Sequence, residues 1–389
     1  MAQISATIIA DSKNEFGNRI TTMVATFPRY ILAELNTHRM FSRNSASSRA
    51  IPFEKMLKSV EENPFIPIAW QKDHKGMQGG EYILPASHEN DKPCAEDLQS
   101  QWLEARDSAV YNAKLLANYG TTKQLCNRLL EPFMWHTVII TATEWENFFA
   151  LRCPQYVFDN STQLLPIKED KVTFRSRKDY TNYMRGYIET EMESQEGLPD
   201  NSLRLNLDFS GIQWLLINKG QAEIHMMALA EAMWDAMNES TPKELKAGEC
   251  HIPFGDNIDA NKIAKELNLH SIEENGITTL ENIKIKIATA RCARVSYTVV
   301  GEEDKEPNYE NDIKLHDRLR EAGHMSPFEH CAQAMSEEDM EFNVHGKTFK
   351  SFTGFGDSYI VDDSAKGWSG NYRGFIQYRK TLSNENITK

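Results

Sequence analysis

The segment from Thr37 to Arg49 reads THRMFSRNSASSR and gathers hydroxyl, amide and guanidinium groups within one short stretch. Ser42, Asn44 and Ser47 carry side chains that can donate hydrogen bonds to phosphate oxygens. Arg49 could bind two such oxygens at once through its planar guanidinium. The composition predicts a binding loop for a small phosphorylated ligand. A polar loop that caps a helix would have the same composition.

A second stretch combines apolar residues with isolated polar ones. The run ENFFALR ends at Arg152, and we expect its Phe148, Phe149 and Leu151 to face the core of the protein. This leaves Asn147 and Arg152 as the candidate functional residues of the run.

Shorter elements lie on either side. Arg128 belongs to an Arg–Pro element, and GQAEI opens an amphipathic pattern at 220–224. Near the carboxyl end, ATARCARVSY (288–297) is followed by GHMSPFEHC (323–331), which contains His330. Ser326 and Pro327 alone would indicate only the start of a helix.

Taken together, these segments resemble the signature regions of flavin-dependent thymidylate synthases. Six of the eight fixed letters of the family signature RHRxxSxNExSxR are present. The matching residues are His38, Arg39, Ser42, Asn44, Ser47 and Arg49. Thr37 replaces the first Arg, and Ser45 replaces the Glu. An Arg–Pro element, an NF-x-x-LR helix and AQ-x-E-I follow in the family as they do here, where the matches are Asn147, Phe148, Leu151, Arg152, Gln221, Glu223 and Ile224.

The segments 288–297 and 323–331 lie near the carboxyl end of this chain, whereas their counterparts lie near the amino end in the family. The resemblance therefore implies a circular permutation, in which 285–335 corresponds to the family's amino-terminal region. Permutation is tolerated when the old termini are close and the new break falls in an exposed loop. The polar segment 153–219 separates two elements that are nearly adjacent in the family. We predict that it is a partly helical insertion within one catalytic domain, 1–389, and that a folded core survives its deletion.

The resemblance also implies an activity: transfer of a one-carbon unit from methylene-tetrahydrofolate to C5 of dUMP, giving dTMP, with FAD as cofactor and NADPH as reductant. The cofactor-binding residues would be His38, Arg39, Asn44, Asn147 and His330. Ser47, Arg49 and Arg128 would bind the nucleotide, and Arg152 would act on the pyrimidine, where a fixed guanidinium favours ionisation at N3. The family uses no enzymic nucleophile, and its members are homotetramers whose sites combine several subunits.

Three positions on the nucleotide side depart from the family. Thr37 removes a cation, Ser45 removes a carboxylate, and Glu34 stands where the family usually has Gln. Ionised Glu accepts hydrogen bonds but cannot donate them, so Glu34 near a base would prefer an amino group to a carbonyl. Two alternatives therefore stay open: the same chemistry on dCMP or with a hydroxymethyl product, and a non-catalytic nucleotide- or flavin-binding homologue.

Composition limits the other possibilities. The net charge of −13 disfavours a nucleic-acid polymer as partner. The six cysteines show no metal-ligand spacing, and no stretch approaches the roughly 20 apolar residues that a membrane span needs. We expect reduced thiols, no bound metal, no membrane association and a cytoplasmic protein.

The predicted elements give an α+β fold, a circularly permuted flavin-dependent thymidylate synthase-like fold with a mixed sheet and packed helices. Alternation predicts strands at 3–10 and 20–27, and further strands and turns at 340–382. The predicted helices are 29–41, 98–118, about 121–130, 143–151, 221–238 and two or three short ones in 259–297. The stretch 62–97 is predicted to be irregular.

Overall fold

The computed structural model describes residues 3–75, 81–85, 94–159, 171–194, 220, 222–267, 272–297, 308–337, 349–350, 360–361 and 371–382, and every structural statement below concerns these residues. None of the helices among them is both long and apolar enough to cross a membrane.

A five-stranded sheet forms the centre, in the order β3-β6-β2-β1-β9. Its strands are β1 (Ser5–Asn14), β2 (Arg19–Pro28), β3 (Ser42–Ser45), β6 (Trp135–Ala142) and β9 (Lys243–Leu245). All neighbours are antiparallel except β1 and β9. The β1–β2 turn contains Gly17 at φ 83°, a conformation that favours glycine, and the Asn14 side chain accepts the backbone N–H groups of Phe16 and Asn18.

The two faces of this sheet differ in chemistry because side chains alternate along each strand. Met23, Ala25 and Phe27 of β2 join a buried cluster with α8 (Ile224–Glu239) and α5 (Glu146–Arg152). Residues of opposite parity, among them Thr22, face the second sheet. That sheet holds β10 (Cys250–His251), β11 (Ala332–Ala334) and β14 (Phe375–Gln377).

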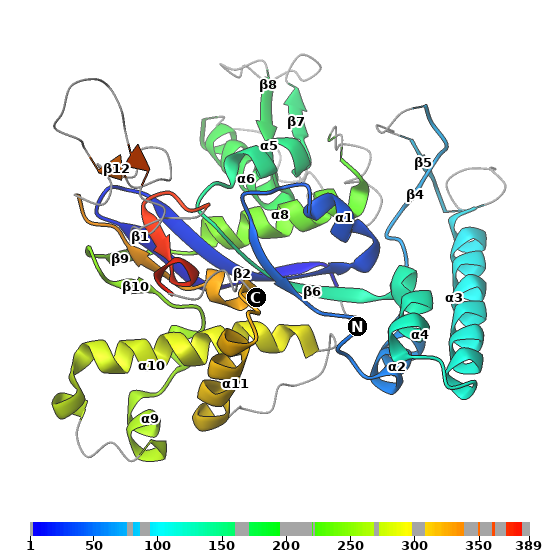
Figure 1. Cartoon of the computed structure of the whole chain (residues 1–389). Helices are drawn as coiled ribbons and strands as arrows, with labels where there is room; N and C mark the ends of the chain where they lie inside the picture. The colour runs from blue at the N-terminus through cyan, green and yellow to red at the C-terminus, as the bar shows by residue number, and fades with distance from the viewer. Residues whose placement is uncertain are drawn as a thin grey trace.

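The remaining helices surround the two sheets. The pair α10 (Ile272–Arg294) and α11 (Tyr309–Glu321) lies on the side of the sheet away from α8, as Figure 1 shows. Beside one end of β6 lie α2 (Phe53–Glu62), α3 (Ala95–Asn118) and α4 (Lys123–Leu130), which share an apolar cluster. The shorter helices are α1 (Leu32–Leu35), α6 (Arg177–Ser194) and α9 (Ala260–Glu266).

Short strands and 3-10 turns complete the described chain. Three two-stranded ribbons pair β4 (Trp70–Gln71) with β5 (Tyr82–Ile83), β7 (Tyr156–Asp159) with β8 (Lys171–Phe174), and β12 (Phe349–Lys350) with β13 (Ile360–Val361). The 3-10 turns are η1 (Arg29–Ile31), η2 (Glu131–Phe133), η4 (Gly255–Asn257), η5 (Val295–Tyr297), η6 (Ser326–Glu329) and η7 (Tyr378–Thr381).

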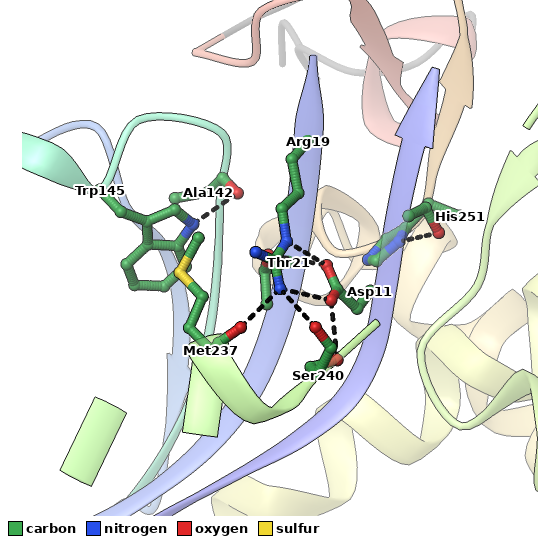
Figure 2. A network of polar contacts seen from close by, with 9 residues as sticks. Asp11, Arg19, Thr21, Ala142, Trp145, Met237, Ser240 and His251 are labelled. Atoms are coloured by element: carbon green, nitrogen blue, oxygen red, sulfur yellow. Dashed lines mark hydrogen bonds and ion pairs between the residues drawn. The ribbon is translucent and has the colours of Figure 1, made fainter. Parts of the chain in front are cut away.

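The carboxyl end of α8 is tied to the β1–β2 hairpin, as Figure 2 shows. Arg19 donates from Nη2 to the carbonyls of Met237, at 2.7 Å, and Ser240, at 3.3 Å, and it pairs with Asp11 at 2.6 Å. Asp11 also accepts the hydroxyls of Thr21 and Ser240. A cation at this place satisfies carbonyls that the helix leaves open, which fixes α8 against the sheet.

The predicted α+β class is confirmed, and so are the strands at 3–10 and 20–27, seen as β1 and β2. Predictions were wrong at four places. Leu151, expected to face the core, is exposed, because only Phe148 and Phe149 of α5 point into the apolar cluster. The helix expected over 29–41 ends at Leu35, where Arg43 Nη1 satisfies open carbonyls by donating to Leu35, at 3.1 Å, and His38, at 3.0 Å. Residues 42–45 form β3 and not a loop, since they pair with β6. The stretch 259–297 holds one long helix, α10, beside the short α9. The permutation and the domain boundaries stay predictions.

Candidate functional site

Arg152, the last residue of α5, meets His38 and Glu34. Phe148 and Phe149 anchor α5 in the core, which holds the end of the helix against the turn after α1. Arg152 Nε donates to His38 Nε2 at 3.2 Å, and Arg152 Nη1 lies 4.0 Å from Glu34 Oε2. The side chains of Arg152 and Glu34 keep 24% and 39% of their surface exposed, so a ligand can reach both.

His38 is held as a neutral ring. It packs edge-on against Phe148, with ring centroids 4.8 Å apart, and stacks on Phe41 at 5.8 Å. Burial, followed by the charges of Arg152 and Arg43, lowers the pKa of His38 below its ordinary value. Since Nε2 accepts from Arg152, the proton of the neutral ring lies on Nδ1.

Beyond Glu34 lies a second carboxylate, Glu223, which caps α8. Its Oε2 accepts the backbone N–H groups of His225, at 2.8 Å, and Met226, at 3.1 Å, and its Oε1 accepts the Tyr30 hydroxyl at 2.8 Å and His225 Nδ1 at 2.6 Å. Burial raises the pKa of Glu223, but hydrogen bonds from His225, Tyr30 and Met226 lower it by more, so the group stays ionised. Burial and the charge of Glu223 raise the pKa of Glu34, while Arg152 lowers it.

Asn44 connects the segment 37–49 to two segments near the carboxyl end of the chain. Its Nδ2 donates to the carbonyl of Cys292 at 2.6 Å, and its Oδ1 accepts the Ser326 hydroxyl at 3.3 Å. Asn44 is buried because β3 lies between β6 and the turn η6. The amide therefore links 37–49 to both 288–297 and 323–331.

His330, at the end of η6, is fully buried and contacts the sheet. Its Nδ1 lies 2.8 Å from the Thr141 hydroxyl, whereas its buried Nε2 has no hydrogen-bond partner among the described residues. Burial, followed by the charge of His251, lowers the pKa of His330 to about 3. An unpartnered buried nitrogen calls for an explanation, and an absent ligand is one.

The predicted phosphate-binding residues lie at the other end of β3. The Ser47 backbone N–H donates to the Ser296 carbonyl at 3.1 Å. Asn127 of α4 holds the loop by donating to the Ser48 carbonyl at 2.8 Å, and next to it in α4 Arg128 is exposed. Arg49 is also exposed, and its guanidinium makes no hydrogen bond or ion pair with the described residues. Two cations are thus presented to solvent near one loop.

The other predicted residues are placed as follows. Thr37 is exposed, and its hydroxyl donates to the Glu34 carbonyl at 2.7 Å. Arg39 and Asn147 are exposed, the latter on α5, while Ser45 is half-buried on β3. Gln221 lies outside the described residues.

The predicted residues thus form three groups in one subunit. The first holds Glu34, Thr37, His38 and Arg152, the second Asn44 and His330, and the third Ser47, Arg49 and Arg128. No hydrogen bond or ion pair among the described residues joins the third group to the first.

Sequence reasoning missed polar residues next to these groups. Tyr30 and His225 bind Glu223, yet each is a single residue in an apolar run and gave no spacing signal. Thr22 and His251 connect to His330 through Thr141, and only the strand register brings them together.

A separate open groove of about 950 Å³ lies between the end of α10 and α11. Its lining includes Arg294, Tyr297, Lys314, Arg318 and His324. Arg294 pairs with Asp312 at 2.7 Å and Lys314 with Glu310 at 2.6 Å, which offsets much of the positive charge. Within the described part of the chain, no group of three or more His, Cys, Asp or Glu side chains could hold a metal ion.

No family model and no curated protein matches the chain. Among solved structures, it is similar to a UMP/dUMP methylase, PolB, from Streptomyces cacaoi bound with 5-Br dUMP, at 13% identity and a TM-score of 0.29, over 39% of this chain and 79% of that chain. The same methylase bound with 5-Br UMP gives 12% identity and a TM-score of 0.27, over 39% and 77%. Similarity this weak carries no inference about fold or function.

Proposed function

We propose that the protein catalyses FAD-dependent transfer of a one-carbon unit from methylene-tetrahydrofolate to C5 of dUMP, giving dTMP, with NADPH as reductant. One observation carries the proposal. Motif blocks that lie far apart in the chain meet in space, since Asn44 binds Cys292 and Ser326 while His38 binds Arg152. A permuted order of the family's elements accounts for this arrangement.

The residues around these contacts fit FAD, an anionic cofactor with many hydrogen-bond acceptors. Arg39 is an exposed cation beside the neutral His38, Asn147 offers an exposed amide, and His330 has the unpartnered Nε2. When bound, FAD would supply the redox chemistry of reductive one-carbon transfer, and the protein would supply orientation and charge.

The nucleotide would use the other side chains. Arg152 would place its guanidinium against the pyrimidine and stabilise negative charge at N3. Ser47, Arg49 and Arg128 would bind the phosphate, for which exposed guanidinium groups are suited. Because no hydrogen bond or ion pair among the described residues joins this group to the Arg152 group, we propose a homotetramer whose sites combine residues from several subunits.

Glu34 favours one alternative, the same chemistry on dCMP or with a hydroxymethyl product. Its carboxylate forms an ion pair with Arg152 and is partly exposed, so it can reach a ligand bound beside Arg152. An ionised carboxylate would accept from the cytosine amino group. Its raised pKa works against this preference, because a protonated Glu34 could also donate to the uracil carbonyl.

The test is a product analysis. The purified protein is incubated with NADPH, methylene-tetrahydrofolate and either dUMP or dCMP, and products are identified by mass spectrometry after a visible spectrum has been recorded. We expect flavin absorption and dTMP from dUMP. A methylated or hydroxymethylated cytosine nucleotide, or a hydroxymethylated product from dUMP, would select the alternative. Bound flavin or nucleotide with no product from either substrate would indicate a binding protein without this chemistry, for which the departures at Thr37 and Ser45 would be the first explanation.

A further inference from the structure

A continuous chain of hydrogen bonds runs from strand to strand along one face of the central sheet and ends at His330. Ser12 Oγ lies 2.9 Å from His251 Nδ1, and His251 Nε2 lies 2.8 Å from Thr22 Oγ1. Thr22 Oγ1 lies 2.7 Å from Thr141 Oγ1, which lies 2.8 Å from His330 Nδ1. All five residues are buried, and four of them are fully buried.

Strand register produces this chain. Thr22 and Thr141 are direct partners on the antiparallel strands β2 and β6, so their side chains lie on one face of the sheet. Ser12 of β1 shares that face, while its neighbour Asp11 points to the α8 face, where Figure 2 shows it with Arg19 and Thr21. The two histidines come from the second sheet and from the end of η6.

Both rings are neutral, because burial lowers the pKa of His251 and of His330 to about 3. A neutral ring has one N–H donor and one bare nitrogen, and each hydroxyl donates a single proton. The chain therefore has two self-consistent arrangements. In one, His330 Nδ1–H donates to Thr141 and every donor points toward Ser12. In the other, every donor points toward His330, whose Nε2 then carries the proton.

We propose that His251 is a positioning residue that sets the tautomer of His330 through Thr22 and Thr141. Without ligand, the first arrangement is favoured. The second would leave a fully buried Nε2–H unpaired, whereas the first leaves the Ser12 hydroxyl, which keeps 5% of its surface and can reach water. The bare Nε2 of His330 therefore carries a lone pair. A ligand that accepts a hydrogen bond at Nε2 would shift both His330 and His251 to their other tautomer. That the ligand is a flavin is the only part that rests on the proposed function.

Solid-state ¹⁵N NMR of the full chain labelled with ¹⁵N-histidine, without added ligand, tests this coupling. His330 is identified by the signals lost in His330→Gln. We expect the Nδ1–H tautomer in the wild type and a clearly increased share of the Nε2–H tautomer in Thr22→Val, since Thr141 then loses the acceptor Thr22 and keeps only His330 and the Tyr372 hydroxyl as described groups that can receive its proton. The population ratio should change by roughly fivefold or more, the least that an unpaired buried donor costs. His251→Leu should have the same effect, and Thr22→Val tests the link if His251→Leu does not fold.

Two variants serve as controls. Thr22→Ser keeps the hydroxyl and should restore the wild-type tautomer. Thr21→Val removes a buried hydroxyl from the opposite face of the same strand and should leave His330 unchanged.

Tyr372 is the competing neighbour of Thr141. Its hydroxyl donates to the Glu329 carbonyl at 2.6 Å, but Thr141 and Ser42 can also donate to it. A His330 tautomer that responds to Tyr372→Phe and not to Thr22→Val would overturn the proposal, as would an unchanged tautomer in both. Because no cofactor is added, failure here is separate from failure of the enzymatic assay.

Discussion

Arg152 and His38 are joined by a hydrogen bond of 3.2 Å between Nε and Nε2, which leaves both Nη atoms of Arg152 to be used elsewhere. The guanidinium is therefore oriented before any ligand binds. His38, being neutral, serves as an acceptor for this bond, so the ring and the guanidinium position one another. The contact gives Arg152 a fixed direction of approach to a base, which preorganised electrostatic stabilisation requires.

Replacing Arg152 should remove turnover but leave flavin bound. Losing one preorganised charge donor typically raises the barrier by about 3 kcal/mol, so Arg152→Ala should reduce kcat by roughly a hundredfold or more. Arg152→Lys keeps the charge but loses the Nε contact with His38, and we expect it to stay strongly impaired. Flavin content from the visible spectrum is the control. Near-normal kcat in Arg152→Ala would remove this residue from the proposed chemistry.

Glu34→Gln should shift preference toward dUMP and away from dCMP. Gln can donate to the uracil carbonyl, and a buried mismatch of this kind costs about 1–3 kcal/mol, which gives roughly tenfold or greater discrimination. The measurement is kcat/KM for both nucleotides. Equal gains for both would mean that Glu34 faces the sugar or phosphate, where its charge is repulsive. An unchanged ratio with unchanged constants would end the case for dCMP.

Arg49→Ala should raise the KM for the nucleotide and leave stability nearly unchanged, since the Arg49 guanidinium is exposed and makes no hydrogen bond or ion pair with the described residues. A charged phosphate contact contributes about 1.5–3 kcal/mol, so binding should weaken at least tenfold. The exposed Arg185→Ala on α6 is a matched control for loss of one positive charge. Calorimetry that finds equal nucleotide affinity in both variants would exclude Arg49 as a phosphate ligand.

The deletion of 153–219 is now expected to destabilise the protein, contrary to the expectation from sequence. Tyr156 is fully buried and donates to Glu231 of α8 at 3.0 Å, and Glu231 also accepts from the backbone and side chain of Arg177. Removing these partners leaves a buried carboxylate unpaired, which costs several kcal/mol. Glu231→Gln in the deleted chain should recover part of the lost stability in urea unfolding. A deletion variant as stable as the wild type would contradict this account.

Mild acid should destabilise the protein below about pH 6.5. Burial lowers the pKa of His136, His251 and His330 to about 3, while the unfolded chain titrates near the ordinary value. Between these values the unfolded state binds protons that the native state does not, so stability is complete above about pH 6.5 and falls as the pH falls. Each histidine contributes about 1.4 kcal/mol per pH unit.

Urea unfolding between about pH 6.5 and pH 5 measures this slope, which native Asp235 partly offsets because burial raises its pKa to about 6 and it takes up a proton in this range. His136→Gln should reduce it by about one histidine's share, and the exposed His324→Gln is the control. A flat profile over this range would contradict the neutral buried rings.

Sequence patterns predicted the elements whose apolar residues repeat regularly, such as β1, β2 and α8. They failed at β3, because Ser42 and Asn44 are polar residues on the buried face and satisfy their hydrogen bonds with distant partners. The helix over 29–41 was extended too far for a similar reason, since Arg43 satisfies the carbonyls at its observed end through contacts that no local rule contains.

The candidate site was predicted only where a motif existed. Arg152 and His38 each belong to a motif, but no pattern predicted the hydrogen bond between them. The role of Glu223 as a helix cap, and the chain from His251 to His330, depend on register and packing between segments far apart in sequence. A lone buried histidine has no pattern around it that marks it.

The pairing of Asn44 with Cys292 has a consequence for biosynthesis. The two residues are separated by 248 positions, and ribosomes add about 5–20 residues per second, so Cys292 is made roughly 12–50 seconds after Asn44. Throughout this interval the polar residues of β3 lack the segment that covers them. Newly made chains should therefore bind a chaperone while translation continues, and release should follow the emergence of the last third of the protein.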